Sequence, residues 1–213
     1  AGGVAHDFNN MLGGIIGGVE LIQNSLESGK DPRPYLSIVL KSAERAAELT
    51  NKLLTFARKQ QVASSVIDVL LPLREAISLL TSTADKRIIV QSSFPNEGIS
   101  VVGDSSQLQS AFLNILINAT HAMPEGGNIY VTAGIQELDA TFCSARGRDI
   151  VPGQYVEIEI RDTGCGMPQE MITRIFEPFF TSKEQGKGTG LGLAVVHGTV
   201  TQHKGFMTVY SEV

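Results

Sequence analysis

Apolar residues recur alternately four and three positions apart in two stretches near the start of the chain. Between them, at residues 28–34, Gly29 and two prolines predict the end of one helix and the start of the next. This spacing is typical of the contact face of packed helices and predicts a helical hairpin over residues 1 to about 62. The first face comprises Ala1, Ala5, Phe8, Leu12, Ile15, Val19, Ile22 and Leu26, and the second Tyr35, Val39, Ser42, Ala46, Leu49, Leu53 and Phe56.

Two helices with one apolar face each cannot enclose a core of their own. The simplest arrangement that covers both faces is a pair of chains forming a four-helix bundle. We therefore expect a homodimer. The alternative is a monomeric hairpin that packs on the rest of the chain.

From about residue 66 the pattern changes to a mixture of helices and strands. Asp104 is a candidate N-cap for a helix that runs on to about residue 123. Residues 136–154 are polar and are predicted to be a long connection between strands. Helices mixed with antiparallel-looking strands favour a two-layer α+β sandwich. Strand-like alternation marks residues 87–94, 127–135, 154–162 and 206–213.

Composition narrows the classes of partner and compartment. A net charge of −5 with only 17 Lys and Arg residues in 213 gives no reason to expect nucleic acid or an anionic membrane as a partner. Cys143 and Cys165 form no CxxC pair, which disfavours zinc and disulfides and favours a reducing cytoplasm. No apolar run has membrane-spanning length. Because the chain starts inside a motif, we expect a piece of a longer protein whose upstream parts can include a membrane span or a sensor.

Three signals in the second half carry candidate chemistry. Asn114 and Asn118 lie four apart on one helical face, Asp162 precedes two glycines in DTGCGM, and glycines occupy every second position from Gly186 to Gly192. Each alone is typical of a solvated helix face, a tight turn or a flexible loop. The glycine run is not a Rossmann fingerprint, because its spacing differs and no predicted strand precedes it.

In this order and spacing, the signals resemble the nucleotide pocket shared by histidine kinases, type II topoisomerase ATPases, the large ATP-driven heat-shock chaperones and mismatch-repair ATPases. A carboxylate at Asp162 can accept the 6-amino group of adenine, and an amide oxygen of Asn118 suits Mg²⁺. Glycines before a helix leave backbone N–H groups free for phosphates, and Lys183 and Lys187 either add charge or are simply solvated. The predicted ATP-binding residues are Asn114, Asn118, Asp162, Gly164, Gly166, Lys183, Gly188, Thr189, Gly190, Leu191 and Gly192, with Asn118 also on the metal.

Five motifs extend this resemblance to the sensor histidine kinases of two-component systems: AHDFNN, LNILINATHAM, DTGCGM, IFEPFFTSK and GKGTGLGL. The resemblance implies a dimerisation and histidine phosphotransfer domain at residues 1–63. It also implies a catalytic ATP-binding domain at residues 64–213, which would lack its last strand because the family normally has one after Val213. His121 departs from the family pattern, which usually has an acidic, amide or other basic side chain there.

His6 is the predicted phosphoacceptor. With Ala5 and Phe8 on the apolar face, His6 and Asn10 fall on the outward face, one turn apart. Asp7 can accept the Nδ1 proton, which leaves Nε2 as the nucleophile. The resemblance further implies transfer to an aspartate of a receiver domain, and for Asn10 a role in orienting water for dephosphorylation of that aspartate.

Two other functions stay open. One is an ATP-hydrolysing clamp, although its relatives usually carry a glutamate where this chain has Asn114, and an amide cannot act as a general base. The other is a degenerate, non-catalytic dimeric scaffold.

Two further features carry hypotheses. Cys165 either lies within reach of the bound base or is an inert core residue. Small residues also share the outward face with His6 and are expected to let a receiver helix approach closely and to let the helix bend; they are Gly3, Gly13 and Gly17, with Gly14 beside them.

Overall fold

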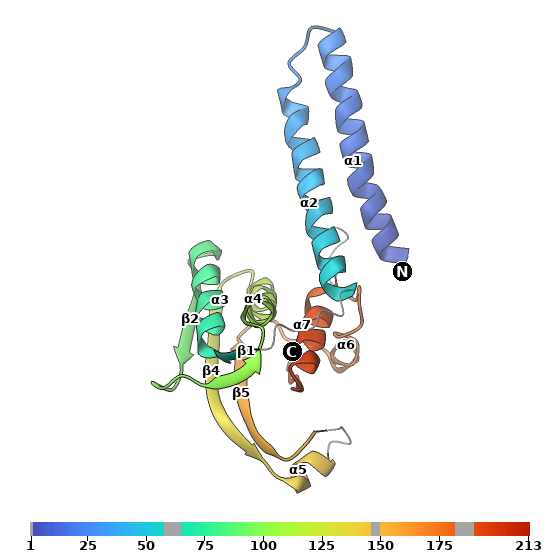
Figure 1. The fold of residues 1–213 in the computed structure, drawn as a ribbon. Helices are drawn as coiled ribbons and strands as arrows, with labels where there is room; N and C mark the ends of the chain where they lie inside the picture. The colour runs from blue at the N-terminus through green and yellow to red at the C-terminus, as the bar shows by residue number, and fades with distance from the viewer. Residues whose placement is uncertain (1, 58–64, 146–149, 182–189) are drawn as a thin grey trace. The chain divides into compact units, whose positions relative to one another are not determined.

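The computed structural model describes residues 2–57, 65–145, 150–181 and 190–213. The chain forms two compact units, one of residues 1–59 and 177–191 and the other of residues 60–176 and 192–213. The helical hairpin belongs to the first unit, and all the described strands belong to the second (Figure 1). The proposed domain boundary at residues 63 and 64 falls outside the described residues.

The first unit contains α1 (Gly2–Glu27) and α2 (Arg33–Ala57), which pack against each other as the apolar spacing predicts. Gly29 ends α1 with a positive φ of 65°, and the N–H of Lys30 donates to the carbonyl of Ser25 at 2.7 Å. Asp31 Oδ1 accepts the N–H of Arg33 at 3.0 Å before α2 begins. The hydrogen bond from the Arg33 side chain lowers the pKa of the Asp31 carboxyl.

Two glycines of α1 allow close contact with side chains of α2. A Cβ on Gly14 would lie 2.6 Å from Ser42 Oγ, and a Cβ on Gly18 would lie 2.6 Å from Val39 Cγ2. The grouping of Gly14 with the outward face of α1 was therefore wrong, because Gly14 faces α2. Val19, on the predicted contact face, stays 43% exposed within the single chain.

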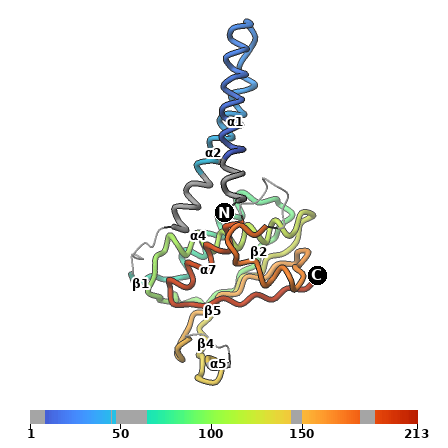
Figure 2. The backbone as a smooth tube through the Cα atoms, turned by 90° about the vertical axis from the view of Figure 1, so that its right-hand side faces the viewer, coloured from blue at the N-terminus to red at the C-terminus, as the bar shows by residue number. Residues whose placement is uncertain are grey.

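The second unit begins with β1 (Ser65–Asp68), α3 (Leu70–Thr83), β2 (Ile88–Ser93), β3 (Ser100–Gly103) and α4 (Ser105–His121). It continues with β4 (Gly127–Leu138), α5 (Ala140–Ala145), β5 (Gly153–Asp162), α6 (Gln169–Ile172) and α7 (Gly192–Gln202). Figure 2 follows the chain from β4 through α5 into β5. No helix among the described residues combines the length and apolar character needed to cross a membrane.

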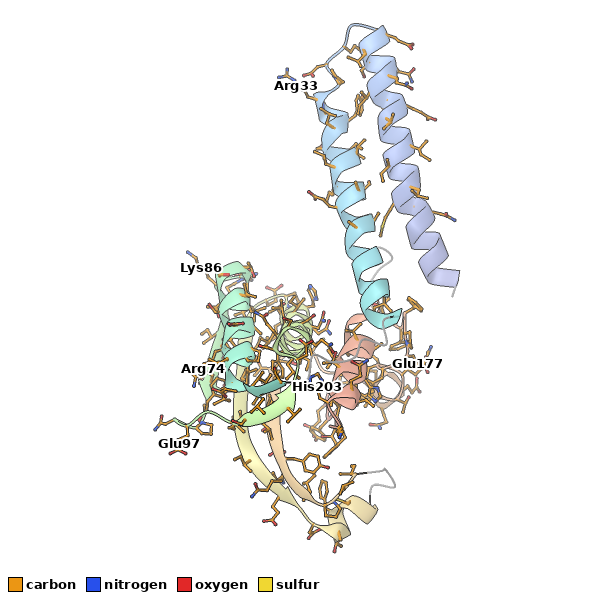
Figure 3. The ribbon with its side chains drawn as sticks, in the orientation of Figure 1. Arg33, Arg74, Lys86, Glu97, Glu177 and His203 are labelled. Atoms are coloured by element: carbon orange, nitrogen blue, oxygen red, sulfur yellow. The ribbon has the colours of Figure 1, made fainter. Side chains whose placement is uncertain are left out.

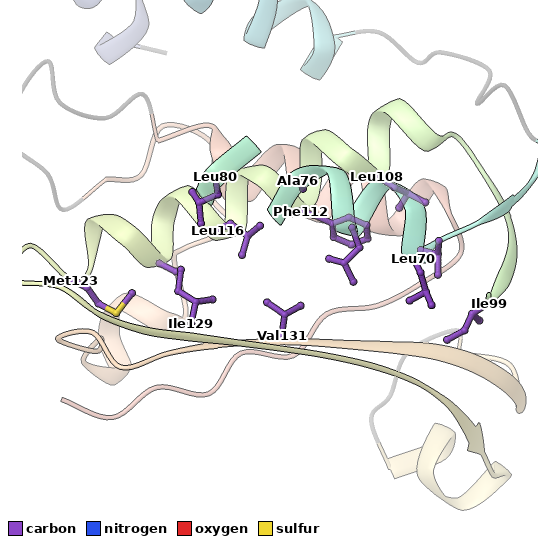
Figure 4. Close-up of a cluster of buried hydrophobic side chains, with 13 residues drawn as sticks. Leu70, Ala76, Leu80, Ile99, Leu108, Phe112, Leu116, Met123, Ile129 and Val131 are labelled. Carbon is purple, nitrogen blue, oxygen red and sulfur yellow. The ribbon is translucent and has the colours of Figure 1, made fainter. Parts of the chain in front are cut away.

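Helices α3 and α4 cover one face of a sheet in the order β2-β4-β5, and α7 packs beside α4. The core between the layers includes Leu73, Leu116, Ile129 and Val131, none of which exposes any surface (Figure 4). Together with the helical first unit, this confirms the predicted fold class of a helical region followed by an α+β sandwich.

Three details of the sequence prediction were wrong. β2 pairs with β4 in parallel, because the chain between them crosses over through β3 and α4. Residues 136–154 are not one loop, since β4 runs on to Leu138 and α5 follows. Residues 206–213 form no strand, although Phe206 does pack against other aromatic side chains. The centroid of its ring lies 6.4 Å from that of Phe142 and 6.1 Å from that of Tyr155.

Candidate nucleotide-binding site

Helix α4 carries both candidate asparagines. Asp104 caps its start as predicted, with Oδ1 accepting the N–H groups of Ser106 and Gln107 at 3.0 and 3.1 Å. One face of the helix is fixed in the core by Leu108, Ala111, Phe112, Leu116 and Ala119. Asn114 and Asn118 lie off that face and are half-buried.

The first residue of α7 faces the two asparagines. A Cβ on Gly192 would lie 3.6 Å from Asn114 Oδ1 and 3.7 Å from Asn118 Nδ2. The structure thus brings together three of the predicted residues from two segments about 75 positions apart. The N–H groups in the first turn of α7 start at this point and have no partner within the helix.

Asp162, the last residue of β5, is exposed, and its Oδ1 accepts the N–H of Gly164 at 2.8 Å. This hydrogen bond fixes Oδ1 of the carboxylate and does not involve Oδ2. The next residues contact the end of α4, where the N–H of Cys165 donates to the carbonyl of Ala122 at 3.1 Å. A Cβ on Gly164 would lie 2.6 Å from Ala122 Cβ, so this contact requires glycine.

Gly166 also has a structural reason to be glycine. Its φ is +68°, and the backbone carbonyl of Glu212 fills the space that a Cβ would take. The N–H of Met167 donates to Ser211 Oγ at 2.9 Å. The DTGCGM loop is therefore held on one side by α4 and on the other by residues 211–213.

The second glycine run is described only at its end. Gly190 has a φ of +62°, and its carbonyl accepts the N–H of Phe179 at 2.9 Å. Leu191, which follows Gly190, is completely buried. Lys183, Gly186, Lys187, Gly188 and Thr189 lie outside the described residues.

The predicted phosphoacceptor box lies in α1, which belongs to a different unit from α4, β5 and α7. The backbone of His6 and Asp7 is helical, and their side chains lie outside what the structure describes. The Asn10 side chain is exposed, one turn beyond His6.

The donor set at α4 fits a magnesium ion that arrives with a nucleotide. The part of the chain that the structure describes holds no group of three His, Cys, Asp or Glu side chains suited to a metal. Asn118 offers an amide oxygen, and Mg²⁺ is commonly held by one or two protein oxygens together with phosphate oxygens and water. Asn118 is therefore the residue of this site that would hold the ion.

Several residues that pack around α4, β5 and α7 escaped the sequence argument. Thr163 hydrogen-bonds to two other segments, and only its place beside Asp162 could have pointed to it. The Nε2 atom of His203 accepts the N–H of Asp104 at 2.9 Å, and its Nδ1 lies 2.8 Å from the carbonyl oxygen of Thr199 (Figure 3). The His197 ring packs on the Phe176 ring, with the two ring centroids 5.1 Å apart.

A charged contact supports the turn that follows α4. Arg87 Nη2 donates to the carbonyl of Pro124 at 3.2 Å and pairs with Asp85 Oδ2 at 2.8 Å. The hydrogen bond from Arg87 lowers the pKa of the Asp85 carboxyl to about 2. Gly126 follows with a φ of +95° and leads into β4.

Two family models match the chain. The model described as "His Kinase A (phospho-acceptor) domain" matches residues 1–62, and the one described as "Histidine kinase-, DNA gyrase B-, and HSP90-like ATPase" matches residues 103–213. The two matches cover the two regions in which the five motifs lie.

Relatives of known name are similar over the full chain. Sensor kinase CckA of Brucella abortus is 39% identical over 100% of this chain and 22% of its own length. Sporulation kinase E of Bacillus subtilis is 31% identical over 100% of this chain and 26% of its own length. The chain therefore spans about a quarter of the length of these relatives.

Solved structures share the fold. The mycobacterial sensor histidine kinase MprB superposes with a TM-score of 0.52 at 29% identity, over 67% of this chain and 81% of that one. The histidine kinase ThkA, solved in complex with the response regulator TrrA, superposes with a TM-score of 0.65 at 20% identity, over 95% of this chain and 54% of that one.

Proposed function

The chain belongs to the sensor histidine kinases of two-component systems, and from that premise we propose that it transfers the γ-phosphoryl group of ATP to His6 and then to an aspartate of a receiver domain. The observation that carries the proposal is the arrangement around α4. This one helix presents Asn114 and Asn118 to the start of α7, and its end packs on the loop that carries Asp162.

Adenine is recognised at Asp162. Because Oδ1 is occupied by the N–H of Gly164, Oδ2 is the oxygen that accepts the 6-amino group of adenine. Guanine presents a carbonyl oxygen at that position, which a carboxylate repels. Selectivity for ATP over GTP follows.

The phosphates lie between α4 and the start of α7. Backbone N–H groups in the first turn of α7, which begins at Gly192, donate to phosphate oxygens at the positive end of the helix dipole. Mg²⁺, when bound through Asn118, supplies neutralisation of phosphate charge. Leu191 is completely buried, and we propose that Lys183, Gly188 and Thr189, which precede it in the sequence, also bind the phosphates.

The transfer is in line. Nε2 of His6 forms a bond to the γ-phosphorus while the bond to the β,γ-bridging oxygen breaks and ADP leaves. Asp7 holds the Nδ1 proton and stabilises the positive charge that develops on the imidazole. Asn10 orients water when the phosphorylated receiver is hydrolysed. ThkA was solved with a response regulator, and we propose the same class of partner here, either separate or fused.

The working form is a homodimer. The isolated hairpin leaves apolar side chains at helical spacing open on both helices, among them Leu12, Ile16 and Val19 of α1 and Leu36 and Leu40 of α2. A second hairpin would cover these side chains in a four-helix bundle.

Incubation of the chain with γ-labelled ATP and Mg²⁺ tests the proposal. We expect a protein-bound label that is acid-labile and alkali-stable, as a phosphoramidate is. His6→Gln should abolish the label and leave ATP binding intact, because His6 belongs to a different unit from Asn114, Asn118 and Asp162.

Other results would identify the alternatives. Free phosphate without labelled protein indicates an ATP-hydrolysing clamp, which the amide at Asn114 disfavours. If neither free phosphate nor labelled protein forms, the chain is a non-catalytic scaffold. Label that persists in His6→Gln would show that the acceptor is another residue.

A further inference from the structure

Thr163 joins three segments next to the adenine-recognising carboxylate. Its N–H donates to the carbonyl of Asn128 at 3.1 Å, and its Oγ1 accepts the N–H of Asn128 at 3.1 Å. The hydroxyl then donates to Met123 Sδ at 3.5 Å. Thr163 therefore ties the residue after β5 both to the start of β4 and to the turn that follows α4.

The surroundings are built to admit this contact. Met123 is buried, at 4% exposure, so its sulfur holds a fixed place beside the core. A Cβ on Gly127 would lie 2.5 Å from Met123 Sδ and 2.8 Å from Thr163 Oγ1. Only glycine at position 127 leaves room for the hydroxyl and the sulfur to meet.

The position of Thr163 in the chain gives this contact a functional meaning. Asp162 precedes it, and the N–H that fixes Asp162 Oδ1 belongs to Gly164, which follows it. Both partners of the Asp162–Gly164 hydrogen bond are therefore attached to the backbone that Thr163 anchors. Beyond Gly164, the N–H of Cys165 reaches Ala122, the residue before Met123.

We propose that Thr163 is a positioning residue for adenine selectivity, which acts by holding Asp162 at a fixed distance from the helix that carries Asn114 and Asn118. This inference rests on the proposed function, since it assumes that Asp162 reads adenine. Without the hydroxyl, Asn128 loses a side-chain acceptor, and the loop gains freedom at the point where the carboxylate is aimed. Thr163 itself need not touch the nucleotide.

Thr163→Val tests the proposal, because it removes the hydroxyl and keeps the β-branched shape. Dissociation constants for ADP and GDP are measured by equilibrium dialysis on the whole chain, and the melting temperature is recorded. We expect the affinity for ADP to fall about fivefold and the affinity for GDP to change little, so that the preference for ADP over GDP becomes smaller. Thr163→Ser keeps the hydroxyl and should remain within about twofold of the wild type. Thr132→Val removes an exposed hydroxyl from β4 and serves as the matched control.

A double-mutant cycle separates positioning from general destabilisation. In an Asp162→Asn background, Thr163→Val should cause no further loss of ADP affinity, because its effect passes through the carboxylate. Equal losses for ADP and GDP, or additive losses in the cycle, would overturn the proposal. If Thr163→Val fails to fold, Met123→Leu takes its place, because it removes the sulfur acceptor and keeps a side chain of similar volume. Met123→Leu must then reduce the preference for ADP over GDP.

The outcome for the wild type keeps the two proposals distinct. A wild-type chain that binds neither nucleotide contradicts the proposed function itself. A wild-type chain that prefers ADP, with Thr163→Val unchanged in that preference, contradicts only the role of Thr163.

Discussion

At the scale of single residues, the hydrogen bond from Gly164 to Asp162 determines what a substitution at Asp162 should do. In Asp162→Asn, the side-chain oxygen keeps the N–H of Gly164, and the amide nitrogen then faces the base. This nitrogen is a donor, so it opposes the adenine amine and suits the guanine oxygen. We expect ADP affinity to fall about tenfold or more and discrimination against GDP to relax, measured by competition between the two nucleotides.

Glu159→Gln is the matched control for this prediction, because it removes an exposed negative charge from the same strand, three residues earlier. It should leave both affinities unchanged. An Asp162→Asn variant with unaltered competition would mean that adenine is read by other residues.

The two cysteines differ in a way that the sequence did not reveal. Cys165 is exposed in the DTGCGM loop, which removes the alternative that it is a core residue, whereas Cys143 is buried. We expect a maleimide reagent to label Cys165 quickly and Cys143 slowly. Saturating ADP should slow labelling of Cys165 if the base lies beside the loop, as followed by mass spectrometry of the two peptides. Equal labelling rates with and without ADP would place the base away from Cys165.

At the scale of elements, α1 contains two pairs of glycines with opposite surroundings. A Cβ on Gly13 or Gly17 would meet nothing within 4 Å, whereas Cβ atoms on Gly14 and Gly18 would collide with α2. Replacing an unobstructed helical glycine by alanine stabilises a helix by about 0.5–1 kcal/mol. Gly13→Ala with Gly17→Ala should therefore raise the melting temperature, and if this face receives the receiver helix, the pair should also slow phosphotransfer.

Gly18→Ala is the matched counterpart, because it adds the same methyl group to the buried side of the same helix. It should lower the melting temperature, since the new Cβ would lie 2.6 Å from Val39 Cγ2. If the Gly13→Ala, Gly17→Ala variant is more stable but transfers phosphate to the receiver at an unchanged rate, these two glycines have no role in docking.

The sequence pattern predicted helices and strands well where the structure of a segment depends on that segment's own residues. The spacing of apolar residues gave the hairpin, and Asp104 marked the start of α4 because N-capping involves only neighbouring residues. The extension of β4 to Leu138 and the packing of Phe206 depend on partners far along the chain, and alternation alone cannot distinguish a paired strand from an extended tail.

The same distinction holds for the site. Resemblance pointed to Asn114, Asn118 and Asp162 because they stand in the quoted motifs and their side-chain oxygens suit the proposed chemistry. Thr163 escaped notice because its contribution lies in contacts with Met123 and Asn128, which are 40 and 35 residues away. A threonine in sequence carries no sign of such contacts.

At the scale of the whole molecule, the apolar side chains left open on the hairpin bear on assembly. Leu40 is 62% exposed and Val19 43% exposed in the single chain, and each would lie against the partner in a four-helix bundle. We expect light scattering after gel filtration to give twice the 22.8 kDa mass of the chain. Val19→Glu combined with Leu40→Glu should give the monomer mass, because burying two carboxylates against the partner costs more than the interface can return.

Ile135→Glu provides the control for that experiment. Ile135 is 65% exposed, but it lies on β4 in the other unit, so the same kind of charge should leave the dimer intact. Nucleotide binding should survive in all three chains, because Asn114, Asn118 and Asp162 belong to one unit and need no partner chain to come together. A dimer that persists in the double variant would place the subunit contact elsewhere, and a monomeric wild type would contradict the proposed homodimer.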